Sequence, residues 1–469
     1  MERSLRDQRA EQRTRTLGEG PLVRVLVSMS LPGIVGMTVN AFYNVTDSAF
    51  IGRLGTAQIG AVAVVFPLLT LVSAVGLTFG VGAASYISRC LGAGRREEAS
   101  RTATVALTGT ILSSIVFSLA AYRYLEPLLF ALGASETVLP YARSYAEVFL
   151  FGASAIMLKQ CLAHCIRAEG AARYSMAGLV LGAVLNIILD PIFIFVLDLG
   201  IAGAAYATVI SQTVAVLFLS AHYVRGRSYI HVGLRALKPD AIILREVIGN
   251  GGPLFFRLLL EAVAFSIVNS FARPFGDAAL GAVGILFRVL LFASFPVYGF
   301  GQGYGPVVGY NYGAKFYDRL MRAVKLGYLW SSIYACTVAV LIVGFAPWIM
   351  RVFTTDPEVI EIGTWGLRVV HAVFPLFGLQ TMALFTCQAL GKSKPAYFIG
   401  ISRQGLFLIP VVFLLSELFG LPGVIASQAV ADVLTALVGV VFLVATTRFL
   451  HRERDEGLLG IKPAESSEV

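Results

Sequence analysis

The feature that most constrains this chain is a series of apolar stretches, each long enough to cross a lipid bilayer. A spanning helix needs about 20 mainly apolar residues, and such stretches recur along the sequence between short polar segments. They are too long for strands and lack the alternating pattern of a membrane β-barrel. We therefore predict an all-α integral membrane protein with twelve transmembrane helices, at 25–52, 59–88, 102–122, 140–163, 174–197, 202–224, 244–272, 279–308, 322–346, 361–390, 396–417 and 421–447.

The composition agrees with this fold class and excludes several others. Hydrophobic residues make up 57% of the chain and charged residues 14%, whereas a soluble domain has about 25% charged residues. A soluble or disordered chain is therefore excluded. The five cysteines are an odd number and lie in or beside apolar runs, so we interpret them as small hydrophobic residues and not as disulfide partners or metal ligands.

Basic residues alternate between the two ends of the predicted spans. The segment before the first span and the joints after every second span hold most of them, and the intervening joints hold little more than Arg53, Arg123, Arg273 and Arg351. This pattern predicts that both terminal segments, 1–24 and 449–469, are cytoplasmic. It assigns the net charge of +9 to contact with membrane lipids and argues against a nucleic-acid partner. We expect a monomer in the cytoplasmic (inner) membrane.

The sequence repeats itself at half its length. The run from Gly55 to Phe66 matches the run from Gly276 to Phe287, 221 positions later, and the same offset relates other glycines and prolines of the two halves. Each half holds six spans, and an even number implies parallel halves related by an axis along the membrane normal. We predict an N-lobe at 25–224, a cytoplasmic linker at 225–243 and a C-lobe at 244–448. Two such bundles around a central cavity are typical of alternating-access transport.

Acidic residues inside apolar spans are costly, and each is a candidate for function. Asp47 lies in the first span, and Asn186 and Asp190 share a face of the fifth, four residues apart. Counting about 1.5 Å per residue from the basic ends puts both aspartates in the same half of the bilayer, where they can face each other. Thr208 of the sixth span can join them. We interpret this group as a carboxylate pair that binds and releases a proton, although Asn and Thr side chains also serve as polar links between helices.

The second half lacks acids at the corresponding positions and carries other polar groups. Arg257 and Glu261, four residues apart, predict an ion pair, and Arg288 and Asp432 lie at similar depths and are expected to pair. A single buried histidine, His371, is more often a hydrogen-bonded core residue than a proton relay. The candidates for the substrate cavity are Tyr43, Asn44, Phe255, Phe256, Arg288, Tyr298 and Gln302.

Nothing in the sequence predicts an enzyme or a bound cofactor. Gly391, Lys392 and Ser393 resemble the end of a phosphate-binding loop, but Thr386 replaces its first glycine. No cluster of histidine and cysteine has the spacing of a zinc site. We expect no catalytic residue and no metal other than a sodium ion, and an ion gradient as the energy source.

Several motifs together resemble the multidrug and toxic compound extrusion (MATE) family. They are Pro32-Gly-Ile-Val-Gly, the run from Ala41 to Asp47 followed by Phe50-Ile-Gly-Arg-Leu-Gly, Asn186-Ile-Ile-Leu-Asp-Pro, and Gly309-Tyr-Asn-Tyr-Gly-Ala-Lys. The resemblance extends from about residue 22 to residue 448. It implies a twelve-helix, two-lobed antiporter that expels small organic cations or amphipathic drugs in exchange for protons or sodium ions.

The resemblance also implies roles for particular residues. Asp47, Asn186, Asp190 and Thr208 match the ion-coupling network of the first lobe. Glu261 matches a glutamate that serves a second, sodium-binding site in other members. The aspartate that accompanies it in the tenth span is absent here, which puts that second site in doubt.

Two other functions, a flippase and a channel, are alternatives to an antiporter, and each predicts a feature that distinguishes it. A flippase for lipid-linked precursors needs a strongly cationic cavity, and the basic residues within the spans are few and expected to be paired: Arg257, Arg288 and Arg403. A membrane channel that uses no ion gradient needs no coupled carboxylates, and its transport would survive an uncoupler.

Overall fold

A computed structural model describes residues 2–233 and 240–458 of the chain. Within these ranges the chain consists almost entirely of helices and contains no strand. Helices satisfy every backbone polar group internally, which a chain in lipid requires. Parts of the predicted linker (234–239) and of the predicted C-terminal tail (459–469) lie outside the described residues.

The long apolar helices confirm the predicted fold class. Eleven helices of the described chain can each cross a membrane, and a bent pair supplies the twelfth span. That pair is Pro357–Ala372 and Phe374–Ala389, which meet at an angle of 47°, so the single span predicted at 361–390 is broken. Pro375 follows the break directly and cannot donate a backbone hydrogen bond into the preceding turn.

The first lobe consists of helices α2 to α8, preceded by α1 and including one π-helix. Their bounds are α1 Glu2–Glu19, α2 Leu22–Gly52, α3 Thr56–Gly92, α4 Arg96–Arg123, α5 Leu125–Ala131, α6 Leu139–Ala168, α7 Ala172–Pro191, η1 Ile192–Val196 and α8 Gly200–Val224.

The second lobe consists of α9 to α16 with a 3₁₀-helix and a second π-helix. Their bounds are α9 Ala241–Ala272, η3 Arg273–Phe275, α10 Asp277–Gly313, α11 Tyr317–Phe353, α12 Pro357–Ala372, α13 Phe374–Ala389, α14 Ser393–Ile401, η4 Ser402–Leu408, α15 Ile409–Phe419 and α16 Leu421–Leu458. Two aspartates fix helix starts here: Asp240 accepts hydrogen bonds from the N–H groups of Ile242 and Ile243, and Asp356 caps α12 in the same way.

Several helices extend past the predicted spans. The prediction at 322–346 corresponds to the 37-residue helix α11, which begins at Tyr317 and ends at Phe353. Polar and charged residues continue the helix because its backbone hydrogen bonds do not depend on hydropathy. At about 1.5 Å per residue, such a helix is longer than the hydrocarbon core is thick.

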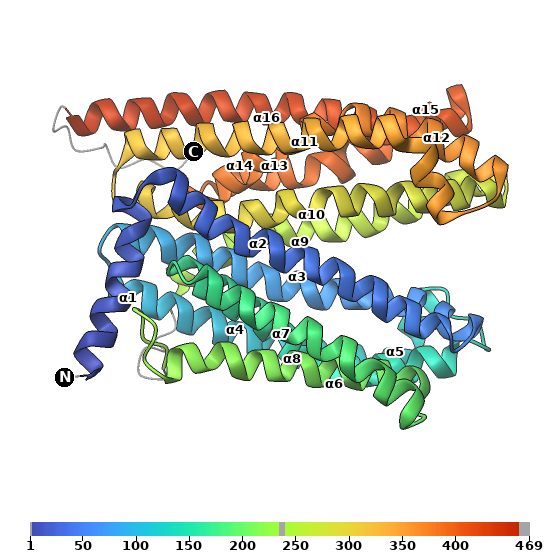
Figure 1. Cartoon of the computed structure of the whole chain (residues 1–469), viewed down its shortest axis with the longest axis horizontal. Coiled ribbons are helices and arrows are strands. Elements are labelled where there is room, and N and C mark those ends of the chain that lie inside the picture. Colours follow the sequence, from blue (N-terminus) through green and yellow to red (C-terminus); the bar gives the residue numbers. More distant parts are fainter. Residues whose placement is uncertain (1, 234–239, 459–469) are drawn as a thin grey trace.

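The two lobes touch at one end of the molecule. Figure 1 shows their helices converging at the end where α1 lies and α16 ends, which we call the terminal end, and spreading apart toward the other end, the far end. The closest contacts between lobes occur where glycines let backbones meet. They pair Gly33 with Gly299, Gly82 with Val247, Gly251 with Thr78, and Gly303 with Met29.

A reciprocal pair of contacts shows how the sequence repeat shapes this interface. A Cβ atom on Gly92 would lie 2.0 Å from the carbonyl oxygen of Tyr310, and one on Gly313 would lie 2.0 Å from the carbonyl oxygen of Arg89. Gly92 and Gly313 are 221 positions apart, as are Arg89 and Tyr310. Each repeat therefore gives the other the same contact, as expected for halves related by a two-fold axis.

Helix α1 lies across the terminal end, crosswise to the other helices (Figure 1). Ala10, Thr14 and Leu17 form its inner face, and each is only 2% exposed. The spacing of four and three residues places them on one side of a helix. The sequence predicted this segment only as a cytoplasmic extension; the structure docks it against the bundle.

Helix α1 contacts both lobes. On the N-lobe side, the Thr14 hydroxyl donates to the carbonyl oxygen of Glu169 over 3.1 Å. On the C-lobe side, the carbonyl oxygen of Leu17 accepts from the Asn311 amide over 3.1 Å, and Arg319 donates to the carbonyl oxygen of Gly20 over 2.5 Å. The helix thus bridges the two lobes at the end where they are already in contact.

Candidate functional site

The structure brings together the polar side chains of α7 and α8 inside the N-lobe. The Asn186 amide donates one hydrogen bond to Asp190 Oδ1 and another to Thr208 Oγ1, each over 3.1 Å. Asn186 and Asp190 are 0% exposed and Thr208 is 3% exposed. A buried polar group of this kind is costly unless it has partners, so the amide fixes the orientation of the Asp190 carboxyl group.

Helix α2 adds Tyr43 and Asp47 to this group. The Tyr43 side chain lies beside Thr208, and the carboxyl groups of Asp47 and Asp190 lie next to each other. Two neighbouring carboxylates repel each other, and a proton shared between them relieves that repulsion. Asp47 Oδ1 and Asp190 Oδ2 are buried and have no partner. The arrangement can therefore hold one proton between two acids and has free acceptor capacity for a second.

The position of Asp190 depends on how α7 ends. Asp190 is followed by Pro191 and by the π-helix η1, Ile192–Val196. A π-turn widens the helix and is frequent at functional sites. Asn44, one position after Tyr43, does not join the group: it is exposed, and its amide donates to the carbonyl oxygen of Asn40 in the same helix over 2.7 Å.

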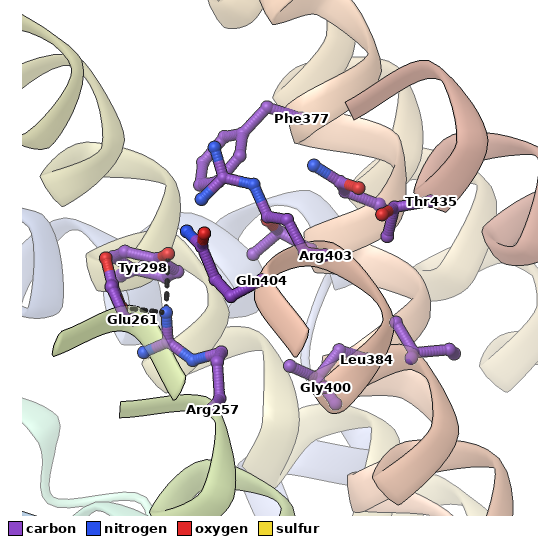
Figure 2. A pocket seen from close by; sticks show the side chains of 12 residues that line it. Arg257, Glu261, Tyr298, Phe377, Leu384, Gly400, Arg403, Gln404 and Thr435 are labelled. Atoms are coloured by element: carbon purple, nitrogen blue, oxygen red, sulfur yellow. Dashed lines mark hydrogen bonds and ion pairs between the residues drawn. The ribbon is translucent and has the colours of Figure 1, made fainter. Parts of the chain in front are cut away.

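The C-lobe holds a second polar group, shown in Figure 2, which we call the C-lobe pocket. It is lined by Arg257, Glu261, Tyr298, Phe377, Arg403 and Gln404, together with apolar residues of α13 and α14, and has a volume of about 370 Å³ including its open side. Arg257 Nη1 donates to Glu261 Oε2 over 3.3 Å and to the Tyr298 hydroxyl over 2.7 Å. The predicted ion pair between Arg257 and Glu261 is thus present, and Tyr298 completes it.

A second ion pair lies deeper in the C-lobe and corrects one prediction. Arg403 Nε donates to Asp432 Oδ1 over 2.6 Å and Arg403 Nη2 to Asp432 Oδ2 over 3.2 Å. The amides of Gln380 and Gln428 also donate to this carboxylate. Asp432 therefore pairs with Arg403, and the predicted pairing with Arg288 is wrong: Arg288 is exposed and makes no ion pair within the described chain.

The other candidate cavity residues are spread over the C-lobe. Phe255 and Phe256 pack edge to face, with ring centres 5.5 Å apart, and Phe256 is 43% exposed. Gln302 lies beside Gly33, where α10 meets α2. His371 is fully buried and its Nδ1 lies 3.1 Å from the carbonyl oxygen of Leu367. This placement agrees with its interpretation as a core histidine.

Sequence reasoning missed some polar groups of the spans. Gln380 and Gln404 are each 3% exposed, and their Oε1 atoms have no hydrogen-bond donor. Lys159 lies within α6, half-buried, and has no hydrogen bond or ion pair in the described structure. The signal was available, because each is a polar side chain in an apolar span. Among the described residues no group of His, Cys, Asp and Glu is arranged to hold a metal ion.

Comparisons with known proteins agree with this architecture. A family profile described as MatE matches twice, at residues 32–192 and 253–414, once in each half. The multidrug export protein MepA of Staphylococcus aureus (strain MSSA476) is 30% identical over 439 residues, which cover 93% of this chain and 95% of MepA.

Solved structures give the same result. One is described as an outward-facing conformation of a multidrug resistance MATE family transporter of the MOP superfamily; it superposes with a TM-score of 0.88 at 27% identity and covers 95% of this chain and 98% of its own. Another, a MOP superfamily transporter from Pyrococcus furiosus described as having a binding pocket of reverse polarity, has a TM-score of 0.88 at 26% identity over 94% of this chain and 98% of its own. The profile matches in both halves, the similarity to MepA and the shared fold show that this chain belongs to the MatE family of multidrug and toxic compound extrusion transporters.

Proposed function

We propose that this protein is a secondary active efflux transporter that exports cationic or amphipathic organic compounds in exchange for protons. The observation that carries the proposal is that the carboxyl groups of Asp47 and Asp190 lie next to each other inside the N-lobe, each with one buried oxygen atom that has no partner. A group that binds one or two protons can couple their movement to that of a substrate. The export of drugs by the similar protein MepA, as its name states, supports the class of substrate.

The geometry suggests how the exchange proceeds. With the terminal end in the cytoplasm, as the basic residues predict, the lobes are closed on the cytoplasmic side and spread apart toward the outside (Figure 1). A second proton that binds to the pair removes its remaining charge and with it the attraction for a bound organic cation. The substrate is then released outward, and closure of the far end returns the protons to the cytoplasmic side.

Two other ideas receive less support from the geometry. A sodium site at Glu261 competes with Arg257, which already neutralises this carboxylate. A flippase for lipid-linked anions needs an excess of free positive charge in the cavity, whereas Arg257 and Arg403 are both paired with acids. Proton exchange therefore remains the best-supported form of coupling, and we propose the cytoplasmic membrane as its location.

Transport by purified protein in liposomes tests the proposal. A pH gradient and a sodium gradient are imposed one at a time, and the movement of the fluorescent cation ethidium is recorded. We expect the pH gradient alone to drive transport, and Asp190→Asn to reduce it at least tenfold. Asp277→Asn is the matched control, because Asp277 is exposed at the start of α10, far along the chain from the pair. Transport driven only by sodium, or unchanged in Asp190→Asn, would contradict proton exchange.

A further inference from the structure

We propose that the C-lobe pocket is a subsite that binds the carboxylate of zwitterionic aromatic substrates. The inference rests on the proposed efflux function. It assigns the two ends of a zwitterionic substrate to different lobes: the acids of the N-lobe attract its cationic part, and the C-lobe pocket binds its anionic part. Its support comes from the arrangement of Arg257, Tyr298, Phe377, Arg403 and Gln404 (Figure 2).

The two aromatic rings of the pocket are already occupied by cations of the protein itself. The Arg257 guanidinium lies over the Tyr298 ring, 4.7 Å from its centre, and the Arg403 guanidinium lies over the Phe377 ring at 4.8 Å. The two rings pack edge to face, 5.6 Å apart. Organic cations bind aromatic faces by cation–π attraction, so here they find both rings already covered by guanidinium groups. The pocket therefore selects against purely cationic groups.

Arg257 retains hydrogen-bonding capacity that its protein partners do not use. Its two described hydrogen bonds, to Glu261 and Tyr298, both leave from Nη1, and its Nε is buried without any partner. A guanidinium presents its N–H groups as a planar fork that matches the two oxygens of a carboxylate. The bond to Glu261 is long, 3.3 Å, and the Glu261 side chain is 34% exposed. Glu261 can therefore turn away when a ligand carboxylate approaches.

The pocket also offers acceptors that lack a donor. Oε1 of Gln380 and Oε1 of Gln404 are buried and unbonded. The amide nitrogen of Gln380 donates to Asp432, which fixes the oxygen on the opposite side. Buried unsatisfied acceptors are unfavourable, so a ligand that brings an N–H group to them gains stabilisation. A substrate with both a carboxylate and an amine satisfies both kinds of group.

The backbone of η4 builds this part of the pocket. Ser402, Arg403 and Gln404 are consecutive and all buried, at 0%, 9% and 3% exposure. Consecutive residues of a regular helix point about 100° apart, whereas a π-turn, which is often functional, brings neighbours closer to one side. The π-helix Ser402–Leu408 thus places a charged residue and an amide together in the pocket.

The pocket lies where the two lobes separate. Tyr298 directly precedes Gly299, which packs against Gly33 of the N-lobe, and Arg257 follows Gly251, which packs against Thr78, by less than two helical turns. A ligand in the pocket therefore sits just beyond the closed contact between lobes, on the side that opens toward the far end.

Two dyes that differ in one group test the inference. Rhodamine 110 carries a free benzoate and is a zwitterion, whereas rhodamine 123 is its methyl ester and is a cation. Both are offered to wild-type protein in liposomes under a pH gradient. We expect export of both, and we expect Arg257→Gln to lower kcat/KM for rhodamine 110 at least tenfold while that for rhodamine 123 does not fall.

Two further variants keep the result interpretable. The double variant Arg257→Gln with Glu261→Gln removes the ion pair without leaving an unpaired charge, and Gln404→Met removes an acceptor at similar volume. Both should lower kcat/KM for rhodamine 110 while still exporting rhodamine 123. Equal losses for both dyes, no loss in any variant, or a wild-type protein that exports only rhodamine 123 would overturn the inference. If wild-type protein exports neither dye in a pH gradient, the proposed efflux function fails as well.

Discussion

The side-chain amide of Asn186 donates to both Asp190 and Thr208, and so joins α7 to α8 beside the carboxyl pair. The bond to Asp190 holds one carboxyl oxygen and leaves the other, Oδ2, without a partner. Asn186 is therefore a positioning residue: it determines which oxygen of Asp190 is available to a proton.

Replacement of Asn186 by alanine tests this role. Asp190 and Thr208 each lose a buried donor, and we expect about 1–3 kcal/mol of destabilisation together with an altered pH profile of transport. Asn44→Ala is the matched control, because the Asn44 amide is exposed and bonds only to its own helix; it should stay within about 0.5 kcal/mol of wild type. Thermal unfolding and transport across a pH series measure both effects. An unchanged pH profile in Asn186→Ala would exclude the positioning role.

The glycines between the lobes should be intolerant of a methyl group. A Cβ on Gly303 would lie 2.2 Å from the carbonyl oxygen of Met29, so Gly303→Ala must push the lobes apart. We expect a shift away from the state closed at the terminal end, seen as a longer distance between spin labels placed on the two lobes there. Gly284→Ala in the same helix meets no atom within 4 Å and should be neutral or slightly stabilising. Equal label distances in the two variants would contradict this account of the closed contact.

Docking of α1 should depend on its buried face. Leu17 is 2% exposed, and Leu17→Asp buries a charge without a partner, which is strongly unfavourable. We expect α1 to detach and its arginines to become sensitive to limited trypsin digestion. Gln12→Asp places the same charge on the exposed side of this helix and should leave the digestion rate near that of wild type. A similar rate of cleavage in both variants would mean that α1 is not held by this face.

The loop after α6 should make stability depend on pH. Glu169 is fully buried, and burial raises the pKa of its carboxyl group from 4.5 to about 6, although Ser228 and Arg13 favour the charged form. Because the folded state binds this proton more tightly, the stabilisation is present below pH 4.5 and is lost as the pH rises through 6. The loss amounts to about 2 kcal/mol at 1.36 kcal/mol per pKa unit.

Glu169→Gln removes this titration. Relative to the variant, wild-type protein should lose about 2 kcal/mol of stability between pH 4.5 and pH 7. Melting temperatures of both proteins at the two pH values give the difference, and the other titrating groups cancel in the comparison. The same pH dependence in both proteins would show that Glu169 does not titrate in this range.

The sequence was sufficient for the number of spans and for the repeat, because both depend on composition and spacing along the chain. It also placed Asp47 and Asp190 at similar depths, since each residue of a helix adds a constant rise. Depth does not give rotation about the helix axis. Arg403 reaches Asp432 from the π-helix η4, which packs against α16, whereas Arg288 is exposed.

The sequence did not predict the docking of α1, and the reason is a different one. Its inner face consists of Ala10, Thr14 and Leu17, and only one of these is a large apolar residue. The helix is also held by hydrogen bonds from the side chains of Asn311 and Arg319 to backbone carbonyls at its C-terminal end, and these residues lie about 300 positions further along the chain. A single sequence gives no pattern for contacts of this kind.

The paired contacts of Gly92 with Tyr310 and of Gly313 with Arg89 have a consequence for the origin of the chain. One surface that contains both a glycine and the carbonyl three residues before it is complementary to a copy of itself. A six-helix ancestor with this surface would assemble as a homodimer before gene fusion joined the two copies. The closed end would thus correspond to the interface of that ancestral dimer. The acids Asp47 and Asp190 of one half and the arginines Arg257 and Arg403 of the other would then be differences that arose between the two copies after fusion.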